Sequence, residues 1–269
     1  MLTILGSRGT IPVSGYSYVK YGGSTPSLFL SSNDTAIIFD AGTGLYKLNS
    51  VKNLKNIFIF LTHLHWDHIM GLPLFSYFYN PSANIKIFID KKDDIDSTEF
   101  IKHLFKEPFF PVSHEKLNCN LQIENIFHGE KITIGNHSIT PYEGNHPNGA
   151  SMFLYKNQNY SFLYATDYEH GSPKDEMLVE VANHVKYFIY DTTYTPEDYR
   201  GEKDGIPKSG WGHSTFEYGA SFAKKAKVKN LVLFHHNPEY TDCFLDKMVI
   251  KSKKLFTNTI AATDELILD

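Results

Sequence analysis

Arginine, cysteine and long apolar segments are scarce in this chain of 269 residues. Only two arginines, Arg8 and Arg200, are present. Recognition of a phosphate must therefore depend on metal ions, histidine, lysine or backbone N–H groups rather than on bidentate arginine contacts. The two cysteines, Cys119 and Cys243, provide no disulfide framework. No apolar run has the length of a membrane span, and the N-terminus lacks the basic and apolar regions of a signal peptide. We therefore expect a cytoplasmic protein without a membrane partner.

Net charge and length narrow the functional classes further. The formal net charge is −4, so the chain as a whole does not attract nucleic acid. From this we expect that a nucleic-acid polymer is not the substrate. The hydrophobic content of 42% is enough for a sizeable core, and the length fits one α/β domain that covers residues 1–269.

One short segment is unusually rich in groups that bind metals. Residues 62–68 read Thr-His-Leu-His-Trp-Asp-His, and they follow an apolar run at residues 56–61. Such a run predicts a strand that is buried on both faces, and open α/β sheets bind their ligands where strands end. Imidazole and carboxylate groups are good ligands for zinc, manganese and iron. The segment therefore predicts a metal site, rather than a polar turn in which histidines occur by chance.

Other predicted strands also end in aspartate or histidine. The strands at 35–39, 160–166, 187–190 and 231–234 are followed by or end at Asp40, Asp167, Asp191 and the pair His235 and His236, and a strand at 138–142 leads to His146. If these strand ends lie along one edge of a sheet, seven or eight potential ligands come together there.

The clearest predicted helix begins next to another histidine. Ser214 and Glu217 have the spacing of a capping box, and the apolar face that follows predicts packing on a sheet. His213 immediately precedes this helix start, where free N–H groups and the helix dipole favour an anion. We interpret His213 as a functional residue; the alternative is a surface histidine at a helix start.

Three other segments have predicted roles in the fold. Residues 69–79 are apolar and aromatic, and we interpret them as a helix packed on the sheet. Residues 100–112 are rich in Phe and Pro, which suits a lid, a dimer surface or the core. The charged run at 91–96 predicts a solvated turn or the start of a helix.

The segment 62–68 resembles the signature of the metallo-β-lactamase-fold hydrolases, and the closer match within them is the ribonuclease Z-like phosphodiesterase branch. Five further segments resemble motifs of this branch: residues 6–12, 39–44, 145–147, 165–167, and the Gly-His-Ser-Thr at 212–215 that continues through a helix to 233–235. The resemblance covers residues 2 to about 250. It implies an α/β fold in which two mixed β-sheets are flanked by helices, as a four-layer αββα sandwich.

The resemblance also implies a site with two divalent metal ions, zinc by default and manganese or iron as alternatives. The implied ligands are His63, His65 and His146 for the first ion, Asp67, His68 and His235 for the second, and Asp167 between the two. His213 would contact the phosphate and assist the leaving oxygen, and Asp67 would also orient the attacking water. Asp40, Asp191 and His236 would orient the ligands. The position directly after the strand favours His235 over His236 as the ligand.

These features predict a dinuclear metal-dependent phosphodiesterase that acts on a small or cyclic phosphodiester, such as a cyclic nucleotide. Ribonuclease Z binds tRNA with a long Gly- and Lys-rich arm, and the sequence contains no equivalent insertion. The alternatives are a hydrolase of a lactam, lactone or thioester, an endonuclease that processes tRNA 3′ ends, and a non-hydrolytic di-iron sensor. Many relatives in this branch are homodimers, so a second copy of the chain is a candidate partner.

Overall fold

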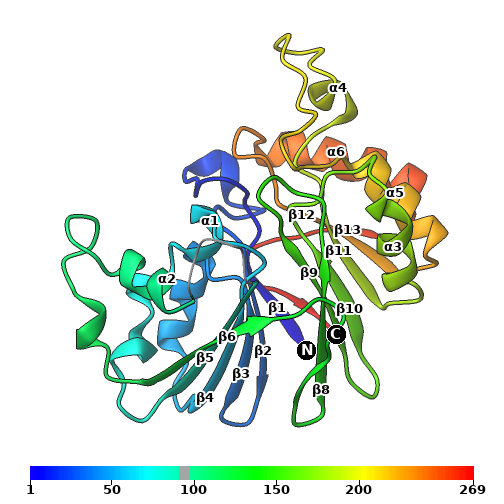
Figure 1. Cartoon of the computed structure of the whole chain (residues 1–269). Coiled ribbons are helices and arrows are strands. Elements are labelled where there is room, and N and C mark those ends of the chain that lie inside the picture. The colour runs from blue at the N-terminus through cyan, green and yellow to red at the C-terminus, as the bar shows by residue number, and fades with distance from the viewer. Residues whose placement is uncertain (91–96) are drawn as a thin grey trace. The chain divides into compact units, whose positions relative to one another are not determined.

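The computed structural model describes residues 1–90 and 97–269 and divides them into two compact units (Figure 1). Unit 1 contains residues 1–6, 24–127 and 264–269, and unit 2 contains residues 7–23 and 128–263. The turn or helix start predicted at residues 91–96 lies outside the described residues.

Unit 1 is built on a mixed sheet of seven strands. Its strands, in sheet order, are β14 (Leu266–Leu268), β1 (Leu2–Gly6), β2 (Ser27–Ser32), β3 (Thr35–Phe39), β4 (Asn56–Phe60), β5 (Asn84–Asp90) and β6 (Asn120–Ile126). Neighbours from β14 to β3 are antiparallel, and those from β3 to β6 are parallel. The apolar run before the histidine motif forms β4 at the middle of the parallel part, where Ile57, Ile59 and Phe60 are completely buried. This confirms the prediction of a buried strand.

The helices of unit 1 are short. They are the 3₁₀ helices η2 (Thr43–Ser50), η3 (Leu72–Leu74), η4 (Ser76–Tyr79) and η5 (His114–Lys116), and the α-helices α1 (Trp66–Ile69) and α2 (Ser97–Leu104). The single helix predicted over residues 69–79 is therefore wrong. Pro73 supplies no N–H for a helical hydrogen bond and disfavours the helical conformation of the residue before it, so the segment divides into short turns. Its Phe75 and Phe78 are nevertheless buried in the core of unit 1.

The aromatic segment at residues 100–112 belongs partly to this core. Phe100 and Phe105 are buried there, whereas the side chain of Phe109 is 80% exposed. The core alternative is confirmed for the first half of the segment.

Unit 2 is built on a second mixed sheet of seven strands. In sheet order these are β13 (Thr259–Ala261), β12 (Asn230–Phe234), β11 (Tyr187–Asp191), β10 (Ser161–Ala165), β9 (Ser151–Lys156), β8 (His137–Glu143) and β7 (Ile132–Ile134). Neighbours from β13 to β10 are parallel, and those from β10 to β7 are antiparallel. The carboxyl ends of β10, β11 and β12 therefore lie along one edge of the sheet, as the sequence predicted.

The helices of unit 2 are η1 (Tyr16–Tyr18), α3 (Lys174–Val181), α4 (Pro196–Tyr199), α5 (Phe216–Lys225) and α6 (Asp242–Leu255). The predicted helix corresponds to α5, which packs on β11 and β12 through Phe216, Ala220 and Ala223. Its cap differs from the prediction: Thr215, not Ser214, is the N-cap residue, and its hydroxyl accepts the N–H of Tyr218. The sequence did not predict α6, which packs on α5 and β13.

Each unit thus contains one sheet with helices packed on it. Two mixed sheets and their helices account for the layers of the expected αββα sandwich, and this fold class is confirmed. In the part of the chain that the structure describes, none of the helices has the length and apolar character needed to cross a bilayer.

Candidate metal centre

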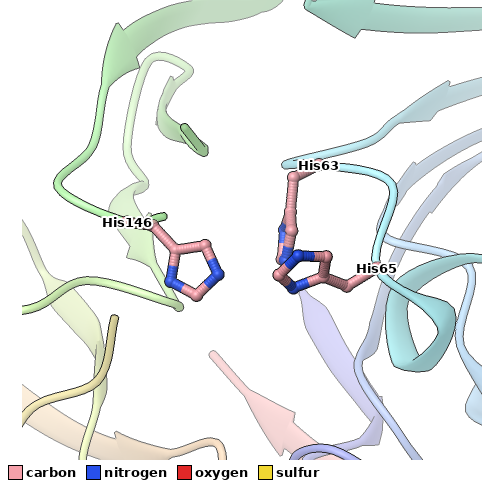
Figure 2. Close-up of side chains that lie close together, drawn as sticks. All are labelled: His63, His65 and His146. Carbon is pink, nitrogen blue, oxygen red and sulfur yellow. The ribbon is translucent and has the colours of Figure 1, made fainter. Parts of the chain in front are cut away.

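The donors of unit 1 lie on the loop that follows β4. The imidazoles of His63 and His65 are near one another, with ring centroids 4.3 Å apart and planes inclined by 72°. Figure 2 shows both side chains on this loop, and it also shows His146, which belongs to unit 2. The ring of His68 lies 4.3 Å from that of His63, and its Nε2 is 3.3 Å from Oδ2 of Asp67. The loop after β4 and the first residues of α1 therefore contain four potential ligands.

A buried aspartate orients the histidines of this loop. Asp40, directly after β3, accepts the Nδ1–H of His68 at 2.8 Å. It also accepts the backbone N–H and the hydroxyl of Thr62, at 2.8 and 3.0 Å. Because that hydroxyl donates to Asp40, it is left to accept the Nδ1–H of His63 at 3.0 Å. Both histidines are thereby held as the tautomer whose lone pair is on Nε2.

The donors of unit 2 come from the ends of several strands. Asp167 follows β10 and His235 follows β12, and both residues have positive φ angles, 51° and 60°. His235 donates its Nδ1–H to the hydroxyl of Thr193 at 2.9 Å, and its Nε2 lies 3.4 Å from Oδ2 of Asp167. Gly9 allows this ring to lie against the N-terminal loop, because a Cβ at position 9 would be 2.4 Å from the imidazole.

His146 lies in the loop after β8 and is held by the segment before α5. Its Nδ1–H donates to the carbonyl oxygen of Gly212 at 2.9 Å. Burial lowers the pKa of His146, which favours the neutral imidazole that a metal ion requires. Its lone pair is therefore also on Nε2.

Asp191, at the end of β11, fixes His213. The Nδ1–H of His213 donates to Oδ2 of Asp191 at 2.8 Å. Oδ1 accepts the N–H and hydroxyl of Thr193 and the N–H of Ser214. Burial raises the pKa of Asp191, but the charge and hydrogen bond of His213, together with His235, hold it below its ordinary value. A charged carboxylate at this position favours the imidazolium form of His213.

The structure brings these predicted residues of unit 2 together. Single donor atoms of Asp167, Asp191, His213 and His235 all lie within 4.8 Å of one another. The ring of His213 is stacked on that of His235 with a centroid distance of 4.9 Å.

His236 has different neighbours. Its Nε2–H donates to the carbonyl oxygen of Ala262, and its ring contacts Tyr21 edge to face. Burial and the nearby Arg8 guanidinium lower its pKa to about 3. His235, rather than His236, is therefore the histidine beside Asp167.

Three residues that orient the site were not identified from the sequence. They are Thr62 and Thr193, whose hydroxyls link a carboxylate to an imidazole, and Glu169, whose carboxylate accepts the N–H groups of Gly210 and Gly212. Thr62 and Thr193 lie one and three residues after the ends of strands that the sequence predicted, at 56–61 and 187–190, and this position is the signal that identifies them.

Arg8 is completely buried. Its guanidinium donates to the carbonyl oxygens of Gly22, Asn237 and Tyr240. This arginine stabilises the loop that follows His235 and His236, and its burial keeps it from contact with a phosphate.

The donor sets of both units fit divalent metal ions. In His63, His68, His146 and His235 an oxygen atom of the protein accepts the Nδ1–H, so that Nε2 is the ligand atom. Carboxylates lie beside His68 and His235 at 3.3 and 3.4 Å. Nitrogen and carboxylate ligands oriented in this way suit zinc, and also manganese or iron.

Comparisons with known proteins agree with this chemistry. A model of the beta-lactamase superfamily domain matches residues 35–236. Ribonuclease Z of Archaeoglobus fulgidus is 26% identical over an alignment that covers 100% of this chain and 97% of the relative. The metallo-beta-lactamase fold protein YhfI from Bacillus subtilis has a TM-score of 0.73 at 17% identity, covering 98% of this chain and 96% of its own. The short form of human tRNase Z has a TM-score of 0.68 at 17% identity, covering 100% and 98%.

These relatives overturn one expectation from the sequence. We expected that a nucleic-acid polymer is not a partner, yet the A. fulgidus relative is a ribonuclease and the human protein is a tRNase. The expectation was wrong because net charge and arginine content describe the whole chain. They do not describe the few groups that contact a phosphate.

Proposed function

The chain belongs to the beta-lactamase superfamily and is a hydrolase of the metallo-β-lactamase fold, and from this membership we propose that it hydrolyses a phosphodiester bond in RNA. The observation that carries the proposal is the pair formed by His213 and Asp191 beside Asp167 and His235. A lactam or thioester hydrolase has no need of a histidine that is held as a proton donor in front of a helix. The ribonuclease Z relative, which matches over the whole chain, supports the same substrate class.

Two metal ions are part of this proposal. Following the family pattern, we assign His63, His65 and His146 to one ion, Asp67, His68 and His235 to the other, and Asp167 to both. The orientation of the histidines within each unit, with Nε2 as the ligand atom, supports this assignment. When bound, the ions supply a water of lowered pKa and positive charge near the phosphate.

The side chains of the protein then have separate tasks. Asp67 accepts a hydrogen bond from the attacking water and orients it toward phosphorus. His213, as an imidazolium, donates the proton of Nε2 to the departing oxygen. Asp191 stabilises this imidazolium, because its carboxylate accepts the Nδ1–H and is itself held by three donors from Thr193 and Ser214.

The test is cleavage of an RNA hairpin that carries a single-stranded 3′ extension. We expect the purified protein to cut this RNA, EDTA to abolish cleavage, and added Zn²⁺ or Mn²⁺ to restore it. The lactam nitrocefin is the control for the other chemistry of the superfamily and should not be hydrolysed. Cleavage at full rate after complete removal of metal would disprove the mechanism.

A small or cyclic phosphodiester is the second candidate substrate. The alignment with the A. fulgidus enzyme extends over 325 positions, more than the 269 residues of this chain, so that relative has segments that this chain lacks. A smaller protein with the same site has fewer residues available to bind a large substrate, which favours a small one. The same assay should therefore include 2′,3′- and 3′,5′-cyclic nucleotides, and hydrolysis of these without cleavage of the RNA would favour the second candidate.

A further inference from the structure

The segment between α4 and α5 exposes a tryptophan on a rigid turn (yellow in Figure 1). The side chain of Trp211 is 51% exposed. One side of its ring is occupied by Lys208, whose ammonium lies 4.7 Å from the ring centroid. The Lys208 side chain is itself only 10% exposed and is paired with Asp204 at 2.6 Å. The lysine thus contacts the indole from within the protein, and about half of the tryptophan surface is accessible to solvent.

Buried Glu169 holds the backbone on both sides of this tryptophan. One carboxylate oxygen accepts the N–H of Gly210 at 2.6 Å, and the other accepts the N–H of Gly212 at 2.8 Å. The N–H of Trp211 donates to the carbonyl oxygen of Lys208 at 3.1 Å. Both glycines have positive φ, 83° and 86°, and a Cβ at position 212 would lie 2.1 Å from Nδ1 of His146. The conformation of the turn is therefore specified by glycine, by a buried carboxylate and by a side chain of the site.

This turn is continuous with the candidate site. The carbonyl oxygen of Gly212, the residue after Trp211, accepts the Nδ1–H of His146. The next residue is His213, which is held by Asp191. Trp211 lies two residues before the proposed proton donor. Because consecutive Cα atoms are about 3.8 Å apart, the Cα atoms of these two residues are close together. A group attached to a phosphate at His213 is within reach of the ring.

We propose that Trp211 is a stacking subsite for a nucleobase adjacent to the scissile phosphate. A half-exposed indole that is supported on one side by a cation presents a flat π surface, and every nucleobase has a complementary one. One indole matches one base in size, whereas a stable protein interface needs a much larger buried area. This inference rests on the proposed function and deepens it, because it specifies that the ester carries a base.

The first test is binding, measured without hydrolysis. The chain has two tryptophans, Trp66 and Trp211, and both are exposed. In W66F the fluorescence comes from Trp211 alone, and in W211L it comes from Trp66 alone. We expect AMP to quench the metal-loaded W66F protein saturably and to bind about tenfold more tightly than ribose 5-phosphate. W211L, which has no aromatic ring at this position, should show no such difference in affinity.

Two outcomes overturn the proposal. One is equal binding of AMP and ribose 5-phosphate to W66F, and the other is the same preference for AMP in W211L, which would locate the base elsewhere. Because AMP is a monoester, this result does not depend on phosphodiesterase activity. If the protein binds AMP through Trp211 but cleaves no RNA, the subsite is supported and the proposed function is wrong. If it cleaves RNA but shows no preference for AMP, the proposed function is supported and the subsite is wrong.

A kinetic comparison separates stacking from a structural role. W211L removes the aromatic surface and keeps an apolar side chain, whereas W211F keeps a smaller ring. For the substrate that the hydrolysis assay identifies, W211L should raise KM about tenfold with little change in kcat, and W211F should restore most of the loss. Equal effects of the two variants, or a loss in kcat alone, would contradict a stacking role.

Discussion

The two units orient their histidines with the same arrangement of side chains. In unit 1, Asp40 accepts the Nδ1–H of His68 and the hydroxyl of Thr62, and that hydroxyl accepts the Nδ1–H of His63. In unit 2, Asp191 accepts the Nδ1–H of His213 and the hydroxyl of Thr193, and that hydroxyl accepts the Nδ1–H of His235. Each aspartate lies at the end of a strand in the parallel part of its sheet. One carboxylate and one hydroxyl are thus sufficient to fix two imidazoles.

The difference between the two arrangements lies in the exposure of one ring. His68 is completely buried, whereas the side chain of His213 is 13% exposed. A buried imidazole with its lone pair on Nε2 suits a metal ligand better than a group that contacts the substrate. A partly exposed imidazole beside a charged carboxylate can meet a substrate and transfer a proton. The same orienting contacts therefore support a metal-binding role in unit 1 and a proton-donating role in unit 2.

The largest expected effect comes from removing one ligand in each unit. His63→Ala and His235→Ala should each reduce the bound metal from about two ions to about one per chain and lower activity about a thousandfold or more. Metal content by mass spectrometry and the rate of RNA cleavage measure the two effects. If one variant kept both ions, the replaced histidine would not be a ligand, and the comparison would fail.

His213→Ala should separate the two roles. We expect kcat to fall about 10²- to 10³-fold while the metal content remains unchanged, because in our proposal this residue donates a proton and is not a ligand. His68→Ala is the matched variant, and it should lose metal as well as activity. Loss of an ion from the His213→Ala protein would assign His213 to the metal set.

Substitution of the two orienting aspartates should have smaller effects, and these should differ between Asp40 and Asp191. Asp40→Asn should weaken metal binding about 10- to 100-fold, since the amide no longer orients His68 as a charged acceptor. Asp191→Asn should lower kcat by about 10- to 100-fold through His213, with a smaller change in metal affinity. Metal titration and steady-state kinetics on both proteins decide between these outcomes. If both substitutions changed metal affinity and kcat in the same way, the different roles that we infer from the exposure of His68 and His213 would be contradicted.

The smallest effect concerns the two thiols, one in each unit. Burial raises the pKa of Cys119 to about 11, whereas Cys243 is exposed. At pH 8 the Cys119 thiol is almost entirely protonated, and its thiolate fraction rises about tenfold for each pH unit up to that pKa. Iodoacetamide at pH 8 should therefore label Cys243 first, and the labelling rate of Cys119 should rise steeply between pH 8 and 10. Peptide mapping follows both rates, and faster labelling of Cys119 at pH 8 would contradict its burial.

Local patterns were sufficient to identify the candidate ligands of unit 1. His63, His65, Asp67 and His68 lie within six residues after an apolar strand, so their proximity follows from chain connectivity. The strands β4, β10, β11 and β12 were also predicted, because apolar runs that are bounded by polar residues indicate buried strands. Helix α6 was missed, since its polar residues reduce the apolar periodicity and its burial depends on contacts with α5 and β13.

The candidate functional residues of unit 2 were predicted less completely. Asp167, Asp191 and His235 were identified because each follows a strand, and parallel pairing of β10, β11 and β12 places them at one edge. Glu169 was not identified, because its partners Gly210 and Gly212 are more than 40 residues further along the chain. The true cap of α5 was missed for a related reason. Ser214 satisfies the sequence pattern of a cap, but its hydroxyl accepts the hydroxyl of Tyr190 instead.

The sequence by itself determined the class of fold, the loop after β4 and the chemical character of the ligands. These depend on apolar patterning and on residues that are neighbours in the chain. Only the tertiary structure decided which nitrogen of each histidine is available, which of His235 and His236 lies beside Asp167, and that the turn around Trp211 is held by Glu169. Those properties depend on hydrogen bonds between distant segments, and no spacing along the chain encodes them.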